Sequence, residues 1–517
     1  MTAIRHHFEL AENLSVTKFL KKLGKHLDFE IASQQYSIKT FYDSFDWRLY
    51  NADMMCEFRQ SKASRELALI DKNTGKQLAV EPLQGDMPRF SGQFPQGLFK
   101  QGIASALEMR ALLPLSQLPY QHYRINILNK DRKTVLRLQI EEHKLLTTHI
   151  SLHELKGYAK AAEKVSTLLQ NKLNIKATKP SRILHKSLKR QGRKTQDYSS
   201  KLAIQLSPDM PADQACKLIY CQLLTAIQVN EASTIADIDS EFLHDFRVAI
   251  RRTRAGLSQI KNTLPARDLA KHTRFFAWLG QITGTTRDLD VYLLSYQDYQ
   301  AALPKSLQAD LAPLYAFLKQ KQVLAQQALV AKLEQPEYRK QLKAWEHFLQ
   351  QDCPKKATAS HAKLSIKTLA DQRIWKVYTR LLHEANAIQA SSPAEALHDL
   401  RKTCKKLRYL MEFFQSLYPA QEFKAGLKAL KGFQAVLGDF QDYEIQEISL
   451  KQFSEEMRAS DTHTNTFLAM GVLVQHLDAL RCAARNDFAA QFKNFKEPHK
   501  RKIFQHLFAP KAVEKNA

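Results

Sequence analysis

Residues 244–254 read HDFRVAIRRTR and residues 398–408 read HDLRKTCKKLR, so one pattern of a histidine followed by several cations occurs twice. A second motif repeats at the same offset along the chain, since GTTRDLD at 284–290 matches GDFQDYE at 438–444. Two motifs that share one offset indicate a duplicated structural unit rather than a chance match. We therefore predict an all-α region of two similar helical bundles related by pseudo-twofold symmetry.

Each repeated helix gathers its cations on one face. At about 100° per residue, positions i, i+3 and i+7 form one stripe, which positions i+4 and i+8 flank. The opposite face carries apolar residues such as Ile250 and Leu407. Asp237 or Asp239 is positioned to cap the first of these helices. The candidate phosphate-binding residues are His244, Arg247, Arg251, Arg252 and Arg254 in the first copy, and His398, Arg401, Lys402, Lys405, Lys406 and Arg408 in the second.

Two kinds of partner can neutralise these cations, which repel one another at this spacing. Acidic residues of the second motif can form ion pairs, most readily with Arg254 and Arg408, which lie off the stripe. Those acids are Asp288, Asp290, Asp442 and Glu444. Alternatively, a phosphate-bearing anion binds, because arginine offers a donor fork, lysine a point charge and histidine a hydrogen bond. Since the same spacing occurs twice, we favour the bound anion.

The composition favours a soluble protein with an anionic partner. The chain has 517 residues, enough for two or more domains, and a net charge of +25. Such a surplus attracts phosphates, nucleic acid or an anionic membrane. Six cysteines without metal-ligand spacing indicate free thiols in a reducing compartment. The sequence shows no apolar signal core and no run of about 18 apolar residues, so we expect a cytoplasmic protein without a membrane partner.

The chain is predicted to hold two domains joined by a basic linker. Residues 1–175 are α+β, with strands expected over 36–42, 66–70 and 134–140, where apolar and polar residues alternate. Residues 176–207 are the expected linker, because 176–194 carry many cations and no acid. Long amphipathic helices then fill 208–500, in halves of about 208–350 and 360–500. Residues 501–517 are predicted to be a basic tail.

The helical region resembles the CHAD family, the conserved-histidine α-helical domain. The family pattern His-x-x-Arg-x-x-x-Arg-Arg-x-Arg, with its glycine-containing Arg-Asp-x-Asp motif, is found in both halves. The second half has lysine at two of the basic positions, Lys405 and Lys406, and Gln441 in place of an arginine. The resemblance covers about residues 208–500 and implies a basic cavity between two pseudosymmetric halves. In this family that surface binds inorganic polyphosphate, and some members localise to polyphosphate granules.

The N-terminal region resembles the CYTH domain, of the triphosphate tunnel metalloenzyme superfamily, which often precedes a CHAD domain. FYDSFDWRL at 41–49 is similar to the Tyr-Phe-Asp-Thr-x-Asp-x-x-Leu segment of that family. LHELKG at 152–157 is similar to its closing Glu-x-Glu-Leu-Lys-x-Gly segment. The resemblance covers about residues 1–195 and implies an antiparallel β tunnel or barrel.

This CYTH-like region departs from the family where metal ligands are expected. The motif Glu-x-Glu-x-Lys reads HFELA at 7–11, Leu-Arg-x-Arg reads CEFR at 56–59, and Glu-x-x-x-Asp reads RLQIE at 137–141. Because Mg²⁺ or Mn²⁺ requires several converging oxygen ligands, we expect no metal, no cofactor and no catalytic residues. The residual candidate ligands are Glu9, Glu141 and Glu154. Three arginines have two possible roles: they are ordinary charges of the barrel, or they bind phosphate at a secondary site without a metal. These residues are Arg59, Arg124 and Arg137.

Three functions are weighed on these grounds. The favoured one is a polyphosphate-binding protein that captures the polyanion in the basic cavity of the CHAD region. The first alternative is a metal-dependent inorganic triphosphatase of the CYTH type, which would use Mg²⁺ or Mn²⁺. The second is a nucleic-acid-binding protein, although no RNA-binding motif is visible and only non-specific phosphate contacts are expected.

Overall fold

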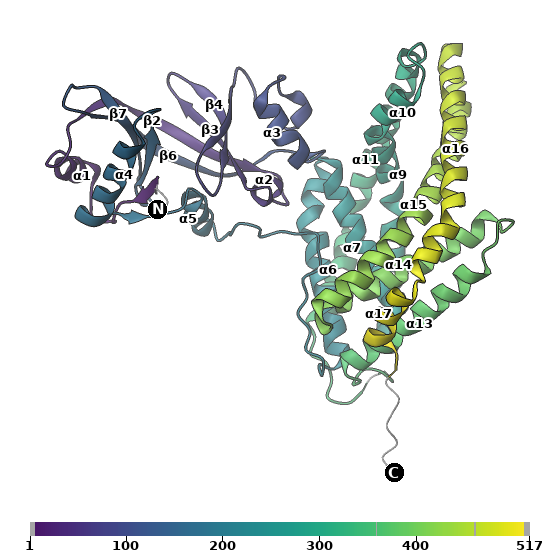
Figure 1. Ribbon diagram of the computed structural model, residues 1–517. Helices are drawn as coiled ribbons and strands as arrows, with labels where there is room; N and C mark the ends of the chain where they lie inside the picture. Colours follow the sequence, from purple (N-terminus) through teal and green to yellow (C-terminus); the bar gives the residue numbers. More distant parts are fainter. Residues whose placement is uncertain (1–5, 358, 460–461, 511–517) are drawn as a thin grey trace. The chain divides into compact units, whose positions relative to one another are not determined.

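The computed structural model describes residues 6–357, 359–459 and 462–510 (Figure 1). The chain divides into two compact units, one ending at Ser200 and the other beginning at Lys201. The first unit is α+β with an antiparallel sheet, and the second is all-α. The predicted fold class is therefore confirmed for both units. The six cysteines are unpaired thiols, as the sequence predicts.

The first unit is built on a nine-stranded antiparallel sheet with the order β5-β4-β3-β2-β6-β7-β8-β1-β9. All three predicted strands are present, within β2, β4 and β7. Along β7 the side chains of Leu136, Leu138 and Ile140 enter the core, so the residues between them face the opposite side of the sheet. The strands are β1 (His7–Glu9), β2 (Phe29–Asp43), β3 (Met54–Ser61), β4 (Arg65–Asp71), β5 (Gln77–Pro82), β6 (Leu113–Leu128), β7 (Thr134–His143), β8 (His149–Glu154) and β9 (Lys176–Ala177).

Five α-helices accompany this sheet in the described part of the unit. The segment expected to be a linker instead contains β9 and α5, because Ile183, Leu184 and Leu188 give the basic stretch an apolar face. That face packs against Phe41 and Trp47. A single π-helical turn, Leu168–Lys172, continues α4. The helices are α1 (Val16–Leu23), α2 (Arg48–Asn51), α3 (Leu98–Leu107), α4 (Ala159–Thr167) and α5 (Arg182–Arg190).

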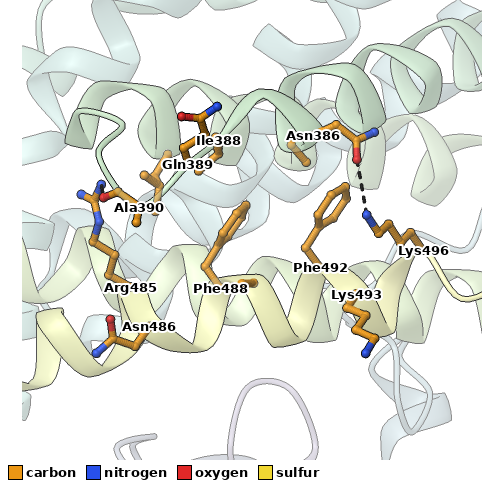
Figure 2. A pocket seen from close by; sticks show the side chains of 13 residues that line it. Asn386, Ile388, Gln389, Ala390, Arg485, Asn486, Phe488, Phe492, Lys493 and Lys496 are labelled. Carbon is orange, nitrogen blue, oxygen red and sulfur yellow. Dashed lines mark hydrogen bonds between the residues drawn. The ribbon is translucent and has the colours of Figure 1, made fainter.

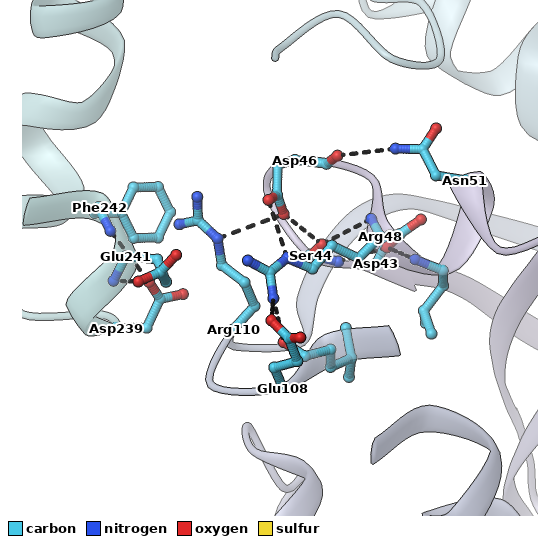
Figure 3. A network of polar contacts seen from close by, with 12 residues as sticks. Asp43, Ser44, Asp46, Arg48, Asn51, Glu108, Arg110, Asp239, Glu241 and Phe242 are labelled. Carbon is cyan, nitrogen blue, oxygen red and sulfur yellow. Dashed lines mark hydrogen bonds and ion pairs between the residues drawn. The ribbon is translucent and has the colours of Figure 1, made fainter. Parts of the chain in front are cut away.

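The FYDSFDWRL segment has a structural role, which Figure 3 shows. The buried Asp43 carboxylate accepts hydrogen bonds from the backbone N–H groups of Ser44, Leu49 and Tyr50 at 2.7, 2.8 and 2.9 Å. Asp46 accepts from the Ser44 hydroxyl and forms an ion pair with Arg48 at 3.1 Å. Burial raises the pKa of Asp43 to about 7, although the three backbone donors oppose this shift. These carboxylates hold the turn into α2.

Asp43→Asn is expected to destabilise the first unit by about 1–3 kcal/mol. The amide oxygen can still accept two bonds, but its NH₂ group would face the backbone N–H of Tyr50. Native-state hydrogen exchange of β2 and β3 measures the change. Asp53→Asn is the control, because Asp53 is exposed and has a φ of 59°, which asparagine tolerates. A stability equal to wild type would show that the carboxylate is not needed here.

In its described residues, the second unit is built from helices joined by loops, with one isolated β-bridge between Pro211 and Ser365. The predicted tail contributes α17, whose Phe504, Leu507 and Phe508 are buried in the main core, so residues 501–508 are not a tail. The helices are α6 (Ala212–Ile235), α7 (Ser240–Gln259), α8 (Ala266–Ile282), α9 (Gly284–Leu294), α10 (Tyr296–Ala302), α11 (Ala312–Leu333), α12 (Pro336–Gln350), α13 (Ile366–Ala387), α14 (Ala394–Phe414), α15 (Ala420–Met457), α16 (Thr464–Phe495) and α17 (Pro498–Phe508).

The two sequence copies fold into corresponding helices. The first motif lies on α7 and on α14, and these two helices pack against each other. The second motif begins α9 in the first copy and lies inside the 38-residue α15 in the second. Thr283 separates α8 from α9, whereas the second copy has one continuous helix at this point. Asp239 caps α7 by accepting from the N–H groups of Glu241 and Phe242 (Figure 3).

Helix α16 is long and apolar enough to cross a membrane by length and composition. Part of its apolar surface packs inside the protein. Met470, Leu473 and Leu477 belong to a core formed with α9, α11 and α15. Phe488 and Phe492 belong to the main core.

Candidate functional site

The cations of both repeats meet in a cavity of about 390 Å³ within the helical unit. Helices α7 and α9 of the first copy line it together with α14 and α15 of the second. Its lining includes only two carboxylates, those of Asp288 and Asp442. The cavity therefore carries an excess of positive charge. The basic residues that line it are His244, Arg247, Arg251, Arg287, Arg401 and Lys405.

One arginine in each copy is positioned over the glycine of the second motif. Arg247 donates from Nη1 to the Gly280 carbonyl at 3.1 Å and to the Thr283 hydroxyl at 3.0 Å. A Cβ atom added to Gly284 would lie 3.6 Å from this Nη1, and one added to Gly438 would lie 3.8 Å from Arg401 Nη2. These are ordinary van der Waals distances, so an arginine crosses the helix beside each repeated glycine, but the contact does not itself require glycine.

Arg251 and Lys405 are the corresponding residues one stripe position further along. The buried Arg251 Nε has no hydrogen-bond partner among the residues that the structure describes. Burial, together with the charges of Arg401 and Arg251, lowers the pKa of Lys405 to about 8. Both observations indicate that positive charge is concentrated here beyond what the surrounding protein neutralises.

Arg287 also lines the cavity. It belongs to the second repeated motif, but it was not among the candidate phosphate-binding residues predicted from the sequence. Its guanidinium donates to the Ser240 carbonyl at 3.1 Å and pairs with Glu241 at 3.6 Å. Burial lowers its pKa and Glu241 partly opposes this shift. Its position three residues after the repeated glycine was the sequence feature that could have identified it as a site residue. Its counterpart in the second copy is Gln441, which accepts from Arg401 at 2.6 Å.

Acidic residues engage several of the predicted cations. Asp442 pairs with Arg401 at 2.9 Å, so a second-motif acid does neutralise one cation of the second copy, and Glu444 lies 2.6 Å from His398 Nε2. Glu412, which lies outside that motif, pairs with Arg252 at 2.9 Å and with Arg408 at 3.3 Å.

Six of the eleven predicted residues lie outside the cavity lining. Two of them are exposed: Lys402, which pairs with Asp399 at 2.9 Å, and Arg254, which extends over Gly280. The structure therefore brings together the motif histidine of the first copy and, from both copies, the residues three and seven positions after the motif histidine. The residues that it leaves outside are Arg252, Arg254, His398, Lys402, Lys406 and Arg408.

A second groove in the helical unit has a different character (Figure 2). It measures about 580 Å³ and has an apolar floor that includes Leu397, Phe488 and Phe492. Arg485 at one end is bound to the backbone carbonyls of Ala390 and Ser392. An aromatic floor offers few donors to a polyanion, so this groove is a weaker candidate for phosphate binding.

The first unit encloses a cavity of about 770 Å³ on the inner face of its sheet. At its centre the buried Lys39 Nζ contacts both oxygens of Glu141, at 2.8 and 2.9 Å, and Glu57 at 3.2 Å. Glu57 also accepts two bonds from Arg59, from Nε and Nη2, at 2.9 Å each. Burial alone would raise the pKa of Glu141, but the charge of Lys39 holds it well below its usual value. The central carboxylates are thus already paired.

This arrangement does not fit the divalent metal of CYTH enzymes. Of the residual candidate ligands, Glu141 pairs with Lys39 and Glu9 pairs with Lys186, while Glu154 lies at 3.9 Å from His6. Within the described ranges, no group of three His, Cys, Asp or Glu side chains is arranged to hold a metal ion. Arg59 lines the cavity, whereas Arg124 and Arg137 are exposed on their strands and do not.

Histidines make this cavity sensitive to acid. His7 Nδ1 lies 3.1 Å from His149 Nε2. Burial lowers the pKa of His7 to about 3 and that of His149 to about 4, so the folded unit keeps both rings neutral. The unfolded chain binds protons below about pH 6.5, where the folded unit does not. The stability that the neutral rings confer is therefore lost as the pH falls from 6.5 toward 4.

We expect the free energy of unfolding of the first unit to fall by about 1.4 kcal/mol per pH unit for each histidine in this range. Hydrogen exchange of β8 on a pH series measures it, after correction for the intrinsic exchange rate. His149→Asn should lower the slope by about 1.4 kcal/mol per pH unit. A slope unchanged in that variant would contradict the role of the histidine pair.

The model of the CHAD domain family matches residues 219–451. The chain is similar to the CHAD domain of Ricinus communis, at 25% identity over 60% of this chain and 96% of that one, with a TM-score of 0.43. It is also similar to PptA from Streptomyces chartreusis, at 16% identity over 56% and 100% of the two chains, with a TM-score of 0.44.

A third similar structure is the putative adenylyl cyclase HpAC1 from Hippeastrum, described as having a dominant triphosphatase activity. Its identity is 12% over 38% and 99% of the two chains, with a TM-score of 0.27. No curated protein matches this chain. Residues 219–451, within the helical unit, thus match the CHAD domain family.

Proposed function

We propose that this chain binds inorganic polyphosphate in the cavity of its CHAD domain. The observation that carries the proposal is the gathering of five arginine and lysine side chains from both repeats around a space that only two carboxylates share. Arginine forks suit the oxygens of successive phosphoryl groups, and a lysine supplies a further point charge. A polyanion at this position would relieve the repulsion among the cations, with His244 as an additional donor.

The shape of the site favours a single, flexible anionic chain over duplex nucleic acid. The cations converge on one partly open cavity from α7, α9 and α14, whereas a duplex presents its phosphates along two separated strands. Among the described residues that line the cavity, only Tyr292 and His244 carry rings on which bases could stack. Nucleic acid is expected to bind only weakly and through its phosphates.

A metal-dependent triphosphatase is the alternative that the first unit raises. Its chemistry would require carboxylates free to hold Mg²⁺ or Mn²⁺ against a triphosphate. Glu57 and Glu141 are paired with Lys39, and Glu9 is paired with Lys186, which opposes this alternative. We propose a cytoplasmic binding protein, able to associate with polyphosphate granules, rather than an enzyme.

The decisive experiment measures binding and turnover on one sample. Polyphosphate affinity is titrated over a series of salt concentrations with double-stranded DNA as competitor, and phosphate release from tripolyphosphate is followed with Mg²⁺ or Mn²⁺. We expect tight binding that weakens steeply with salt, resists DNA and shows no turnover. Metal-dependent release of phosphate would overturn the proposal in favour of an enzyme. Complete displacement by DNA would indicate a nucleic-acid-binding protein.

Polyphosphate affinity is also expected to depend on the protonation of Lys405. Because its pKa in the free protein is about 8, the ammonium form is lost as the pH rises through 8, and with it one ligand charge. Affinity should therefore fall by up to about tenfold for each pH unit above 8, until the pKa in the complex is reached. Lys405→Arg, which stays protonated, should flatten this profile in a fluorescence titration. An equally steep profile in Lys405→Arg would assign the titration to another group.

A further inference from the structure

A buried lysine stands at the centre of the cavity of the first unit, where it links carboxylates from two other strands. Lys39 comes from β2, Glu57 from β3 and Glu141 from β7. The Lys39 and Glu57 side chains are 4% and 5% exposed, and that of Glu141 is 14% exposed. Burial alone would lower the pKa of Lys39, but the charges of Glu141 and Glu57 outweigh it and raise this pKa. The side chain therefore stays protonated as an ammonium.

The carboxylate oxygens around this ammonium are grouped as part of a metal-ligand set would be. Glu141 presents both oxygens to Lys39 and Glu57 presents one, all within 3.2 Å of a single nitrogen atom. His143 is buried beside them, with Nε2 at 3.7 Å from Glu141, and its ring nitrogens have no hydrogen-bond partner in the described part of the chain. Carboxylate oxygens are ligands that Mn²⁺ accepts.

We propose that the Lys39 ammonium takes the place of a divalent cation in this cavity, and that Glu57 and Glu141 form a Mn²⁺ site once Lys39 is shortened. With Lys39, the four central charges, including Arg59, cancel. Without it, two carboxylates face one guanidinium and the centre becomes anionic. A divalent cation would then be attracted to the position that the ammonium occupies, and shifts of the two glutamate side chains would bring their oxygens to metal-ligand distance.

The test is a Mn²⁺ titration of the full chain, followed by the electron paramagnetic resonance signal of free Mn²⁺. Lys39→Ala is compared with wild type, with Lys39→Ala/Glu57→Gln and with Lys76→Ala. Lys76 lines the same cavity, so its removal changes the charge there equally. We expect Lys39→Ala to gain one site that binds at least about tenfold more tightly than any site of wild type. The double variant and Lys76→Ala should lack that site.

Two results would overturn the proposal. The first is a folded Lys39→Ala protein without the additional site. The second is wild-type Mn²⁺ binding that Glu57→Gln abolishes, because the metal would then bind beside the ammonium. If Lys39→Ala does not fold, Lys39→Gln serves instead, since its amide keeps one hydrogen bond to a carboxylate. The wild-type measurement is independent of either variant, and the result is independent of polyphosphate binding by the CHAD domain.

Discussion

Replacing Arg251 and Lys405 together by glutamate is expected to weaken polyphosphate binding by at least about a hundredfold. Each substitution removes an attraction and adds a repulsion inside a half-buried cavity, where a contact between unit charges is worth about 4 kcal/mol at an effective dielectric constant of about 20. A loss of about 1.4 kcal/mol already changes affinity tenfold. Titration at several salt concentrations measures the loss, and the dependence of log affinity on log salt should become shallower by about two.

The matched control replaces Arg254 and Lys402 by glutamate. This pair comes from the same two helices and changes the net charge equally, but both side chains are exposed and lie outside the cavity. We expect its affinity to fall by less than about threefold at moderate salt, because exposed charges are screened. Equal losses in the two pairs would mean that affinity follows net charge alone, and the cavity would no longer be the binding site.

Lys39→Ala is expected to destabilise the first unit by about 3–5 kcal/mol, the largest effect on folding that we predict. The substitution leaves Glu57 and Glu141 buried without their shared cation, and breaking a buried ion pair in this way is more costly than removing the pair. Native-state hydrogen exchange of β7 and β8 measures the loss. Lys76→Ala is the control and should stay within about 0.5 kcal/mol of wild type.

The cluster of Lys39, Glu57 and Glu141 also makes the stability of the first unit depend on pH. Because the pKa of Glu141 is lowered in the folded unit, the stability that it confers is present above 4.5 and is lost as the pH falls through the folded value. Because the pKa of Lys39 is raised, its contribution is complete below 10.5 and is lost only as the pH rises through a higher value. Lys39→Met with Glu57→Gln and Glu141→Gln should recover part of the lost stability. A Lys39→Ala protein as stable as wild type would contradict this account.

The helical periodicity of the repeats predicted the part of the site that depends on local geometry. Residues three and seven positions after each motif histidine share a face, and Arg247, Arg251, Arg401 and Lys405 all line the cavity. The flanking positions were less predictable, because α7 and α14 pack against each other. That packing places Arg252 and Arg408 against Glu412, a residue outside both motifs. The sequence alone does not reveal which flank of a helix meets its neighbour.

The central group of the first unit could not be predicted from local pattern. Alternation within β2 does place Ser37, Lys39 and Phe41 on one face, but it does not say that Glu57 and Glu141 lie opposite. Their meeting depends on the registers of β2 with β3 and of β6 with both β2 and β7. Similarly, the density of cations in 176–194 obscured the apolar face of α5. Charge composition identifies what a segment attracts, whereas its apolar spacing decides whether it packs.

Glu412 has a consequence for the history of the duplication. It belongs to the second copy, yet it pairs with Arg252 of the first copy as well as with Arg408 of its own. The corresponding position in the first copy is Ser258, which is exposed and carries no charge. A homodimer of first halves would lack this acid, and a homodimer of second halves would have two. At this position the two halves are therefore complementary rather than interchangeable, since one carboxylate of the second half serves an arginine from each half.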